Sequence, residues 1–241
     1  MGQCLSIFIE LLKAAQEEEQ QQQQQQTHHQ EPPSTAETSS SPNAAATYPS
    51  LPADAEQHRV RNVYDGDTLT LTDERRVRFL GIDTPEIKEK QPFAQEAKAY
   101  SKDLCDKKDI WISFDGDNKQ DHYGRLLAFV WVPAPENNNG NSYLCVNEGL
   151  VAHGFASAYT PNNKQAKLHN WDKLVRLQSN ARTQKRGMWS NFQDDSVYKT
   201  ANGAAYHRRD CQHLTKVKHV EELATSQAMD RGLHACRTCM G

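Results

Sequence analysis

The sequence predicts an α+β protein with a small β-barrel and about three helices. Short segments rich in β-branched and aromatic residues come first in the central part of the chain. An Asp-Gly pair separates the first two of them, and segments with helical periodicity are interleaved and follow. The chain has 241 residues and a net charge of −3, and no apolar run approaches the roughly 20 residues of a membrane-spanning helix. The composition therefore excludes a transmembrane protein.

The strands and helices follow in order from residue 58. Side chains alternate in character, as in β-strands, between Val60 and Leu71 on either side of the Asp65-Gly66 pair. This pattern predicts a β-hairpin. The apolar run from Val77 to Ile82 predicts a third strand that ends before Pro85. The remaining periodicities predict a helix over 93–104, strands over 109–114 and 126–132, and helices over 147–153 and 164–181.

The first residues carry a lipidation motif. In Met-Gly-Gln-Cys-Leu-Ser, Gly2 becomes the N-terminus after removal of the methionine, as the N-myristoylation pattern requires, and Cys4 is a candidate for palmitoylation. One myristoyl chain binds membranes only marginally, so a second acyl chain would make the anchor stable. We expect residues 1–15 to anchor the chain to the cytoplasmic face of the cell membrane. Residues 16–57, which include seven consecutive glutamines, are expected to form a disordered Gln/Pro/Ser-rich linker.

Four acidic residues of the central block are spaced so that they can meet at one end of the barrel. Asp65 and Asp67 lie in the hairpin turn, and Asp83 and Glu86 follow the end of the third strand. Carboxylate and carbonyl oxygens prefer hard cations such as calcium or magnesium, and this block lacks the Cys and His clusters that softer metals prefer. The spacing therefore predicts an oxygen-liganded metal site.

Two arginines accompany these acids. Arg78 precedes the second acidic turn, and Arg125 closes the segment that begins at Asp121. Guanidinium groups bind phosphates through two parallel hydrogen bonds, and a hard cation with two arginines and a spare carboxylate can neutralise a phosphodiester while activating water. The combination indicates phosphodiester hydrolysis, although each fragment taken alone is more often an ordinary surface feature.

Together these motifs resemble those of the staphylococcal nuclease (thermonuclease) family in order and spacing. The resemblance covers roughly residues 58–190 and is carried by Asp65-Gly66-Asp67-Thr68, Arg78, Asp83-Thr84-Pro85-Glu86, Asp121 to Arg125, Tyr159 to Asn163 and Gly187-Met188-Trp189. It implies an OB-type five-stranded β-barrel with helices, and a sugar-non-specific, calcium-dependent endonuclease that cuts DNA and RNA and leaves 3′-phosphates. The acylated start ahead of such a domain is similar to that of plant calcium-dependent nucleases tied to the plasma membrane.

The resemblance also implies a role for each motif residue. Calcium would be held by the carboxylates of Asp67 and Asp83 and by the backbone carbonyl of Thr84, with Asp65 in a supporting position. Glu86 would position or deprotonate the attacking water.

The phosphate and the nucleotide would be bound by a second group of residues. The resemblance implies that Arg78 and Arg125 bind the scissile phosphate and stabilise its pentacoordinate transition state. Tyr123 and Tyr159 would line the nucleotide pocket. Nucleic acid is the expected partner besides the membrane, no small-molecule cofactor is expected, and protein partners are not readable from the sequence.

The C-terminal segment carries a candidate metal-binding set of its own. His207 and Cys211 lie four residues apart and are followed by Cys236 and Cys239, so that three thiols and an imidazole match the ligands of tetrahedral zinc. A short segment with few apolar residues would gain stability from a structural metal. The segment resembles Ada-like metal-binding modules. His213 is a rival ligand, and a redox-active Cys-x2-Cys pair or a disordered tail is the alternative.

The sequence therefore predicts four parts: the anchor over 1–15, the linker over 16–57, a catalytic domain over 58–190 and a zinc-binding module over 198–241. The predicted activity is that of a membrane-tethered, calcium-dependent endonuclease. An alternative is a non-cleaving, membrane-tethered OB-fold module that binds nucleic acid. A third hypothesis places the function in the C-terminal segment, with the barrel as its scaffold.

Overall fold

The computed structural model describes residues 46–117, 119–134, 142–160 and 168–240. The lipidation candidates Gly2 and Cys4, the anchor segment and most of the predicted linker lie outside these residues, as do residues 161–163 of the motif that begins at Tyr159. The folded part begins before residue 58, because β1 (Thr47–Tyr48) and the first residues of β2 (Glu56–Val63) lie in the segment predicted as linker.

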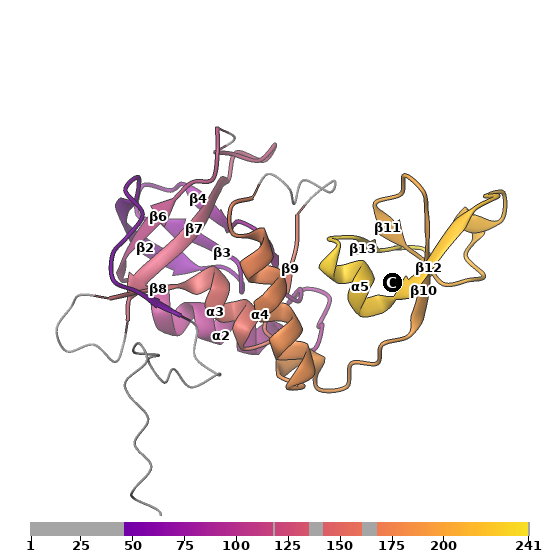
Figure 1. Cartoon of the computed structure of the whole chain (residues 1–241). Helices are drawn as coiled ribbons and strands as arrows, with labels where there is room; N and C mark the ends of the chain where they lie inside the picture. The colour runs from indigo at the N-terminus through magenta and orange to yellow at the C-terminus, as the bar shows by residue number, and fades with distance from the viewer. Residues whose placement is uncertain (1–45, 118, 135–141, 161–167, 241) are drawn as a thin grey trace, which may run out of the picture. The chain divides into compact units, whose positions relative to one another are not determined.

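Five strands form a closed barrel, as the sequence predicts (Figure 1). Neighbouring strands follow the order β2-β3-β4-β7-β6, and β6 pairs back with β2. The pairing of β4 with β7 is parallel, and the other pairings within the barrel are antiparallel. The strands that follow β2 are β3 (Thr68–Leu71), β4 (Arg76–Phe79), β6 (Asp109–Ser113) and β7 (Leu126–Pro133).

The prediction of one strand over 77–82 is wrong. The strand β4 ends at Phe79, and the chain turns at Gly81 before the short strand β5 (Ile82–Asp83). Gly81 has a φ of +79°, a left-handed conformation that favours glycine, and an added Cβ would lie 2.7 Å from Leu174 Cδ1. The strand β5 pairs with β9 (Ser157–Ala158), and β8 (Tyr143–Cys145) joins β1 to β7.

Three α-helices pack against the barrel (Figure 1): α2 (Ala94–Cys105), α3 (Val146–Ala152) and α4 (Trp171–Thr183). A 3-10 turn, η3 (Gly187–Trp189), follows α4. Of the helix predicted over 164–181, residues 164–167 lie outside the described residues, and α4 begins at Trp171; ahead of it, the backbone N–H of His169 donates to Asp115 Oδ2 (2.8 Å). None of the helices among the described residues is long and apolar enough to cross a membrane.

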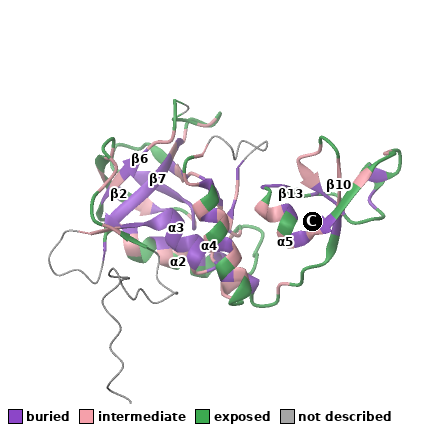
Figure 2. Cartoon of the chain, in the orientation of Figure 1, coloured by how far each residue is buried: buried purple, intermediate pink, exposed green. Residues whose placement is uncertain are grey.

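The apolar core lies between the barrel and these helices (Figure 2). The side chain of Asn147, near the start of α3, is completely buried in it. Its Oδ1 accepts a hydrogen bond from the N–H of Val130 (2.9 Å), and its Nδ2 donates to the carbonyls of Leu80 (2.9 Å) and Ala128 (3.3 Å). Asn147 thus ties α3 to β7 and to the turn that leads from β4 to Asp83.

A second buried polar contact fixes the N-terminal end of the described chain. Glu148 of α3 is fully buried, and its carboxylate accepts hydrogen bonds from the hydroxyl of Tyr48 (2.6 Å) and the ammonium of Lys173 (2.8 Å). A buried carboxylate is costly unless it is paired in this way. The contact therefore holds β1 against α3 and α4, which explains why the folded part extends to residue 47.

The C-terminal residues form small sheets of their own. The strand β10 (Ser196–Thr200) pairs antiparallel with β12 (Val220–Ala224), and β11 (Ala205–Tyr206) pairs parallel with β13 (His234–Ala235). A 3-10 turn, η4 (Gln212–Leu214), and a short helix, α5 (Thr225–Asp230), connect them. The apolar cluster inside this segment is small and comprises Val197, Tyr206, Leu223, Ala228 and Leu233.

Replacing Asn147 with alanine is expected to destabilise the barrel. The change would leave the buried N–H of Val130 and the carbonyl of Leu80 without partners, which should lower the free energy of unfolding by about 3 kcal/mol. Urea denaturation measures this difference. The exposed Asn191→Ala variant is the control and should change stability by less than about 0.5 kcal/mol. Equal stability of the two variants would contradict the assigned role of Asn147.

Candidate active site

Arg78 of β4 lies between two of the predicted metal ligands. Its Nη2 donates to Asp83 Oδ1 at 2.6 Å, and its Nη1 lies 3.1 Å from Asp67 Oδ2. The same Nη1 donates to the carbonyls of Phe79 and Ile82, so the guanidinium holds both ends of the turn between β4 and β5. The side chains of Arg78 and Asp67 are 14% and 7% exposed, so solvent screens their attraction only weakly.

Strand pairing and helix packing place Asp67 beside this guanidinium. Thr68 pairs with Arg78 across β3 and β4, and Asp67 is the residue before Thr68. The turn that carries Asp67 is held from its other side by α2, where Ser101 Oγ donates to the carbonyl of Gly66 at 2.5 Å. A Cβ at Gly66 would lie 2.8 Å from a side chain of α2, so only glycine allows this close approach.

The carboxylate of Asp67 is fixed by hydrogen bonds on both sides. Its Oδ2 accepts from the backbone N–H and the hydroxyl of Thr84, both at 2.9 Å, and its Oδ1 accepts from the hydroxyl of Thr68 at 3.1 Å. Asp65 Oδ1 accepts the backbone N–H of Asp67 at 3.2 Å. Asp65 therefore braces the turn that carries Asp67, while its supporting role for calcium stays a prediction.

Negative charge is concentrated at this end of the barrel. Burial raises the pKa of Asp83 to about 6, and the charges of Asp67, Glu86 and Asp65 raise it further against the lowering effect of Arg78. The pKa of Asp65 is raised to about 6 by burial and by the charge of Asp67. One guanidinium thus does not neutralise the carboxylates that surround it.

Glu86 is exposed, at the start of the loop that follows β5. Its backbone N–H donates to Gln91 Oε1 at 2.8 Å, and the N–H of Gln91 donates back to the carbonyl of Glu86 at 3.2 Å. Gln91 also donates to Glu89 at 2.8 Å. Gln91 was not predicted from the sequence. Its side chain binds a backbone N–H of its own loop, and no motif marks such a contact.

Arg125 is oriented by Asp121 in the predicted segment. Asp121 Oδ2 accepts from Arg125 Nε at 2.7 Å, while Oδ1 accepts the backbone N–H groups of Tyr123 and Arg125. These hydrogen bonds from Arg125 and Tyr123 outweigh the effect of burial and lower the pKa of Asp121. The Arg125 guanidinium lies 5.5 Å from the centre of the Tyr123 ring, and Tyr123 is 74% exposed.

Strand pairing places Arg125 level with the start of β4, whereas the acids lie beyond the other end of that strand. Leu126 pairs with Val77, so Arg125 lies at the level of Arg76, which is two residues or about 7 Å along β4 from Arg78. Among the described residues, no hydrogen bond or ion pair links Arg125 to Asp67, Asp83 or Glu86. Arg125 therefore stands apart from Arg78 and pairs with Asp121 instead.

Tyr159 is half-buried at the end of β9. Its backbone N–H donates to the carbonyl of Gly81 at 2.9 Å, and Ser157 pairs with Asp83 two residues earlier. The pairing of β5 with β9 therefore places Tyr159 next to the turn that carries Asp83. The pocket-lining role of Tyr159 stays a prediction.

The donor chemistry around Asp67 and Asp83 suits a hard cation. Both carboxylates contact the same guanidinium and therefore face one small space, and Thr84 follows Asp83 directly. Burial is the main cause of the raised pKa of Asp83, and the charges of Asp67, Glu86 and Asp65 add to it; a divalent cation would stabilise the charged carboxylates. The residues present thus fit calcium held by two carboxylates and a backbone carbonyl.

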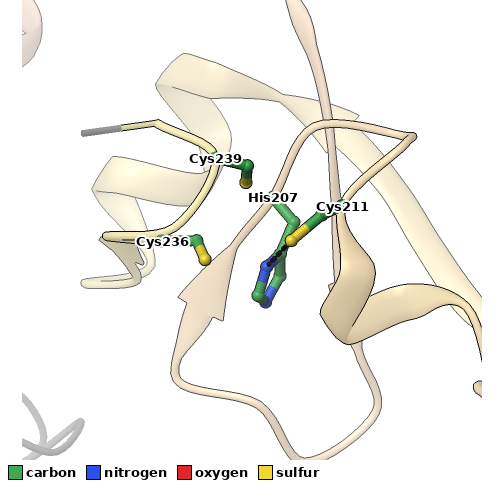
Figure 3. Close-up of side chains that lie close together, drawn as sticks. All are labelled: His207, Cys211, Cys236 and Cys239. Atoms are coloured by element: carbon green, nitrogen blue, oxygen red, sulfur yellow. Dashed lines mark hydrogen bonds between the residues drawn. The ribbon is translucent and has the colours of Figure 1, made fainter.

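A second donor cluster lies in the C-terminal segment. The ligand atoms of His207, Cys211, Cys236 and Cys239 all lie within 4.8 Å of one another, and Figure 3 shows the four side chains pointing toward one another. This is the one group of three or more His, Cys, Asp or Glu residues gathered so closely in the described ranges. The rival ligand His213 is not part of it. The imidazole of His213 contacts the hydroxyl of Thr238 at 3.0 Å instead.

Local pairing explains why these four residues meet. The parallel pair β11 and β13 aligns Tyr206 with Ala235, so the residues that follow, His207 and Cys236, lie side by side. His207 Nδ1 lies 3.3 Å from Cys211 Sγ. Tetrahedral zinc with bonds of about 2.0–2.3 Å requires ligand atoms about 3.4–3.8 Å apart, so the cluster needs only a small contraction to bind the ion.

Comparison with known proteins gives consistent matches. A family model described as "Staphylococcal nuclease homologue" matches residues 76–191. SPbeta prophage-derived endonuclease YokF of Bacillus subtilis is 34% identical over 136 residues, which make up 52% of this chain and 41% of that protein. Thermonuclease of Staphylococcus hyicus is 30% identical over 148 residues, or 58% of this chain and 79% of the other. An uncharacterized endonuclease of Escherichia coli is 34% identical over 148 residues, or 60% and 84%.

These matches agree with the geometry of the site. The stretch matched by the family model contains Arg78, the turn from Asp83 to Glu86 and the segment from Asp121 to Arg125. The chain spans less than half of YokF but about four fifths of the two shorter relatives. On the strength of these matches and of the barrel, the chain belongs to the staphylococcal nuclease family.

Proposed function

We propose that this protein is a calcium-dependent endonuclease that hydrolyses phosphodiester bonds of DNA and RNA. The observation that carries the proposal is the convergence of Asp67, Asp83 and Asp65 around Arg78, with Glu86 on the loop that follows Asp83 and Arg125 directly before the neighbouring strand β7. Acidic residues crowded beside two arginines fit a reaction in which an anionic phosphate, a cation and a water molecule meet. Membership of the nuclease family supports the same conclusion.

Asp67, Asp83 and the carbonyl of Thr84 would hold calcium. When bound, the ion supplies positive charge that offsets the charge of the phosphate. Asp65 would keep the Asp67 turn in place through the hydrogen bond to the backbone N–H of Asp67. Arg78 would maintain the spacing of the two ligand carboxylates and, as the resemblance implies, contact the phosphate.

The chemical step needs a base, a charge stabiliser and a leaving group. Glu86, which is exposed and held at its backbone by Gln91, would take a proton from water as the water oxygen bonds to phosphorus. The bond from phosphorus to the 5′-oxygen breaks, and the leaving oxygen takes a proton from solvent water, which gives a 3′-phosphate and a 5′-hydroxyl. Arg125, oriented by Asp121, would stabilise the charge that develops on the phosphoryl oxygens. Tyr123 and Tyr159 offer rings for the neighbouring nucleotide.

The alternative of a non-cleaving nucleic-acid-binding barrel explains fewer of these features. A binding surface gains nothing from clustered carboxylates, which repel phosphates. The third hypothesis places the function in residues 198–241. It does not explain why acidic residues and an arginine cluster in the barrel. A binding module has no need for both Glu86 and Arg125, and the third hypothesis predicts that deleting residues 198–241 removes the function.

The membrane anchor is part of the proposal. It rests on the motif at Gly2 and Cys4, which lies outside the described residues, and on the two-chain rule for stable lipid anchoring. Acylation at both positions would hold the nuclease at the cytoplasmic face of the cell membrane, with the segment that follows as a tether.

The proposal also assigns zinc to His207, Cys211, Cys236 and Cys239. Three thiolates and one imidazole leave no open coordination position, so the ion would be structural. The small apolar cluster of this segment supports a need for such an ion.

Cleavage of denatured DNA should require calcium and Arg125. The wild-type chain is expected to cut in calcium, to cut more weakly in magnesium, and to be inactive in EDTA. Arg125→Ala should lower kcat by about 100-fold or more, because the transition-state charge loses its stabiliser. Glu86→Gln should lower kcat by about 100-fold or more while substrate binding is retained.

The control for the first variant is Arg59→Ala, which removes an exposed arginine paired with Asp109 on the barrel surface. It should cleave at the wild-type rate. Cleavage that persists in EDTA would contradict the calcium requirement. Full activity of both Glu86→Gln and Arg125→Ala would contradict the assigned site.

Membrane association should depend on Gly2 and Cys4. In cells, Gly2→Ala should move the protein from the membrane fraction to the soluble fraction, because both acyl chains are lost when the first is not attached. Cys4→Ser should leave only partial, reversible association. Gln3→Ala is the matched control and should stay with the membrane. Equal membrane recovery of Gly2→Ala and wild type would rule out the anchor.

Zinc should bind in a ratio of about one ion per chain through His207 and not His213. Metal analysis of the purified protein is expected to find zinc in wild type and His213→Ala, and to find it strongly reduced in His207→Ala and Cys236→Ser. Loss of zinc from His213→Ala with retention in His207→Ala would reverse the ligand assignment.

A further inference from the structure

Basic side chains gather on the loops that carry the four zinc-ligand candidates. Residues 205–220 and 234–240 contain five Lys or Arg residues and one acidic residue, whereas the rest of the C-terminal segment, residues 191–204 and 221–233, contains two basic and five acidic residues. All five basic side chains of the first set are exposed. We call this set the basic surface; it comprises Arg208, Arg209, Lys216, Lys218 and Arg237.

The acidic and the basic regions differ in their ion pairs. On the acidic side, Glu221 pairs with Lys199 at 3.4 Å and also with Arg231. Among the described residues, none of the five members of the basic surface forms an ion pair with an acidic side chain. Arg209 lies 4.9 Å from the centre of the Tyr198 ring, which fixes its direction without neutralising it. The positive charge of the basic surface is therefore available to a partner.

The four-residue cluster sets the geometry of this surface. The backbone N–H of Arg208 donates to Cys239 Sγ at 3.4 Å, and Arg237 lies between the two cysteines of the Cys-x2-Cys pair. Arg208 and Arg237 thus come from two different loops that the cluster joins (Figure 3). Arg209 and Lys218 line a cavity of about 300 Å³ together with Cys211.

We propose that the basic surface binds the sugar-phosphate backbone of a nucleic acid, as a second substrate contact outside the barrel, and that a metal ion in the His/Cys cluster fixes its shape. Arginine forks bind phosphate oxygens through two parallel hydrogen bonds, and lysines add point charges. Such contacts supply most of the affinity of proteins for nucleic acids regardless of sequence. The proposal rests on the proposed function, since the polyanion it names is the substrate of the barrel.

The composition of the surface favours a nucleic acid over an anionic membrane. Protein surfaces that lie on membranes combine basic residues with exposed apolar side chains that enter the lipid. Within the part of the chain that the structure describes, the exposed large apolar side chains are Tyr64 and Tyr123, and both belong to the barrel. The basic surface offers charge and hydrogen-bond donors only.

The salt dependence of DNA binding tests the proposal. The full chain carrying Glu86→Gln, which is expected to bind without cutting, is titrated with a labelled single strand of about 30 nucleotides in calcium-free buffer, and fluorescence anisotropy is measured over a range of salt concentrations. The test variant adds Arg208→Gln, Lys218→Gln and Arg237→Gln. The control variant instead adds Lys102→Gln, Lys107→Gln and Lys108→Gln, which remove three exposed charges at the end of α2.

The test variant should bind about tenfold or more weakly at moderate salt, and the slope of log affinity against log salt should fall by about 2, since each lost contact to a single strand changes it by about 0.7. The control variant should keep the affinity and slope of the parent. The zinc content of the test variant must equal that of the parent, which excludes unfolding as the cause. Equal affinity of the test and control variants would overturn the proposal.

Two further measurements separate this proposal from its rivals. Cleavage of a trinucleotide, which fills only the barrel site, should proceed at the wild-type rate when the three test substitutions are placed in the otherwise wild-type chain. Failure of the wild-type chain to cut any substrate would refute the proposed function, whereas the anisotropy comparison would still decide the binding proposal. A test variant that loses binding to phosphatidylserine vesicles but keeps DNA binding would assign the surface to the membrane and overturn the proposal.

Discussion

The contact of Arg78 with Asp67 and Asp83 is the interaction on which the site depends. Three carboxylates near one another repel, and this repulsion adds to burial, which is the main cause of the raised pKa values of Asp65 and Asp83. The guanidinium offsets part of the repulsion and at the same time binds the carbonyls of the β4–β5 turn. One residue in the middle of a barrel strand therefore fixes both the path of the chain and the spacing of the acids. Without this turn, Asp67 and Asp83 would not be held beside one guanidinium.

Much of the fold was predictable because its signals are local. Alternation of apolar residues predicted the β2–β3 hairpin and the strands β6 and β7, and helical spacing predicted α2 and α3. The contacts that escaped prediction are long-range. The backbone N–H of His169, ahead of α4, donates to Asp115, 54 residues away. The strand β1 is ordered because Tyr48 reaches Glu148, 100 residues away. No pattern within a short window contains these contacts.

In the candidate site, too, local motifs identified some residues, whereas others depend on long-range contacts. Motif spacing identified the acids and arginines, and the structure brings Asp67, Arg78 and Asp83 into contact. The supporting groups escaped prediction because they act through the backbone. Ser101 holds the carbonyl of Gly66 from 35 residues away, and Gln91 holds the N–H of Glu86. No sequence motif marks such side chains, although they set the positions of the motif residues.

The two donor clusters are built so that their expected ions would not compete. Carboxylate and carbonyl oxygens near Asp67 and Asp83 prefer hard cations, and thiolates at Cys211, Cys236 and Cys239 prefer softer ones. The oxygen site lies beside an exposed loop, where an ion can exchange, whereas a four-ligand cluster leaves no position for exchange with water. With the proposed ions bound, the barrel would respond to changes in calcium while the C-terminal loops, and the basic side chains they carry, would keep one shape.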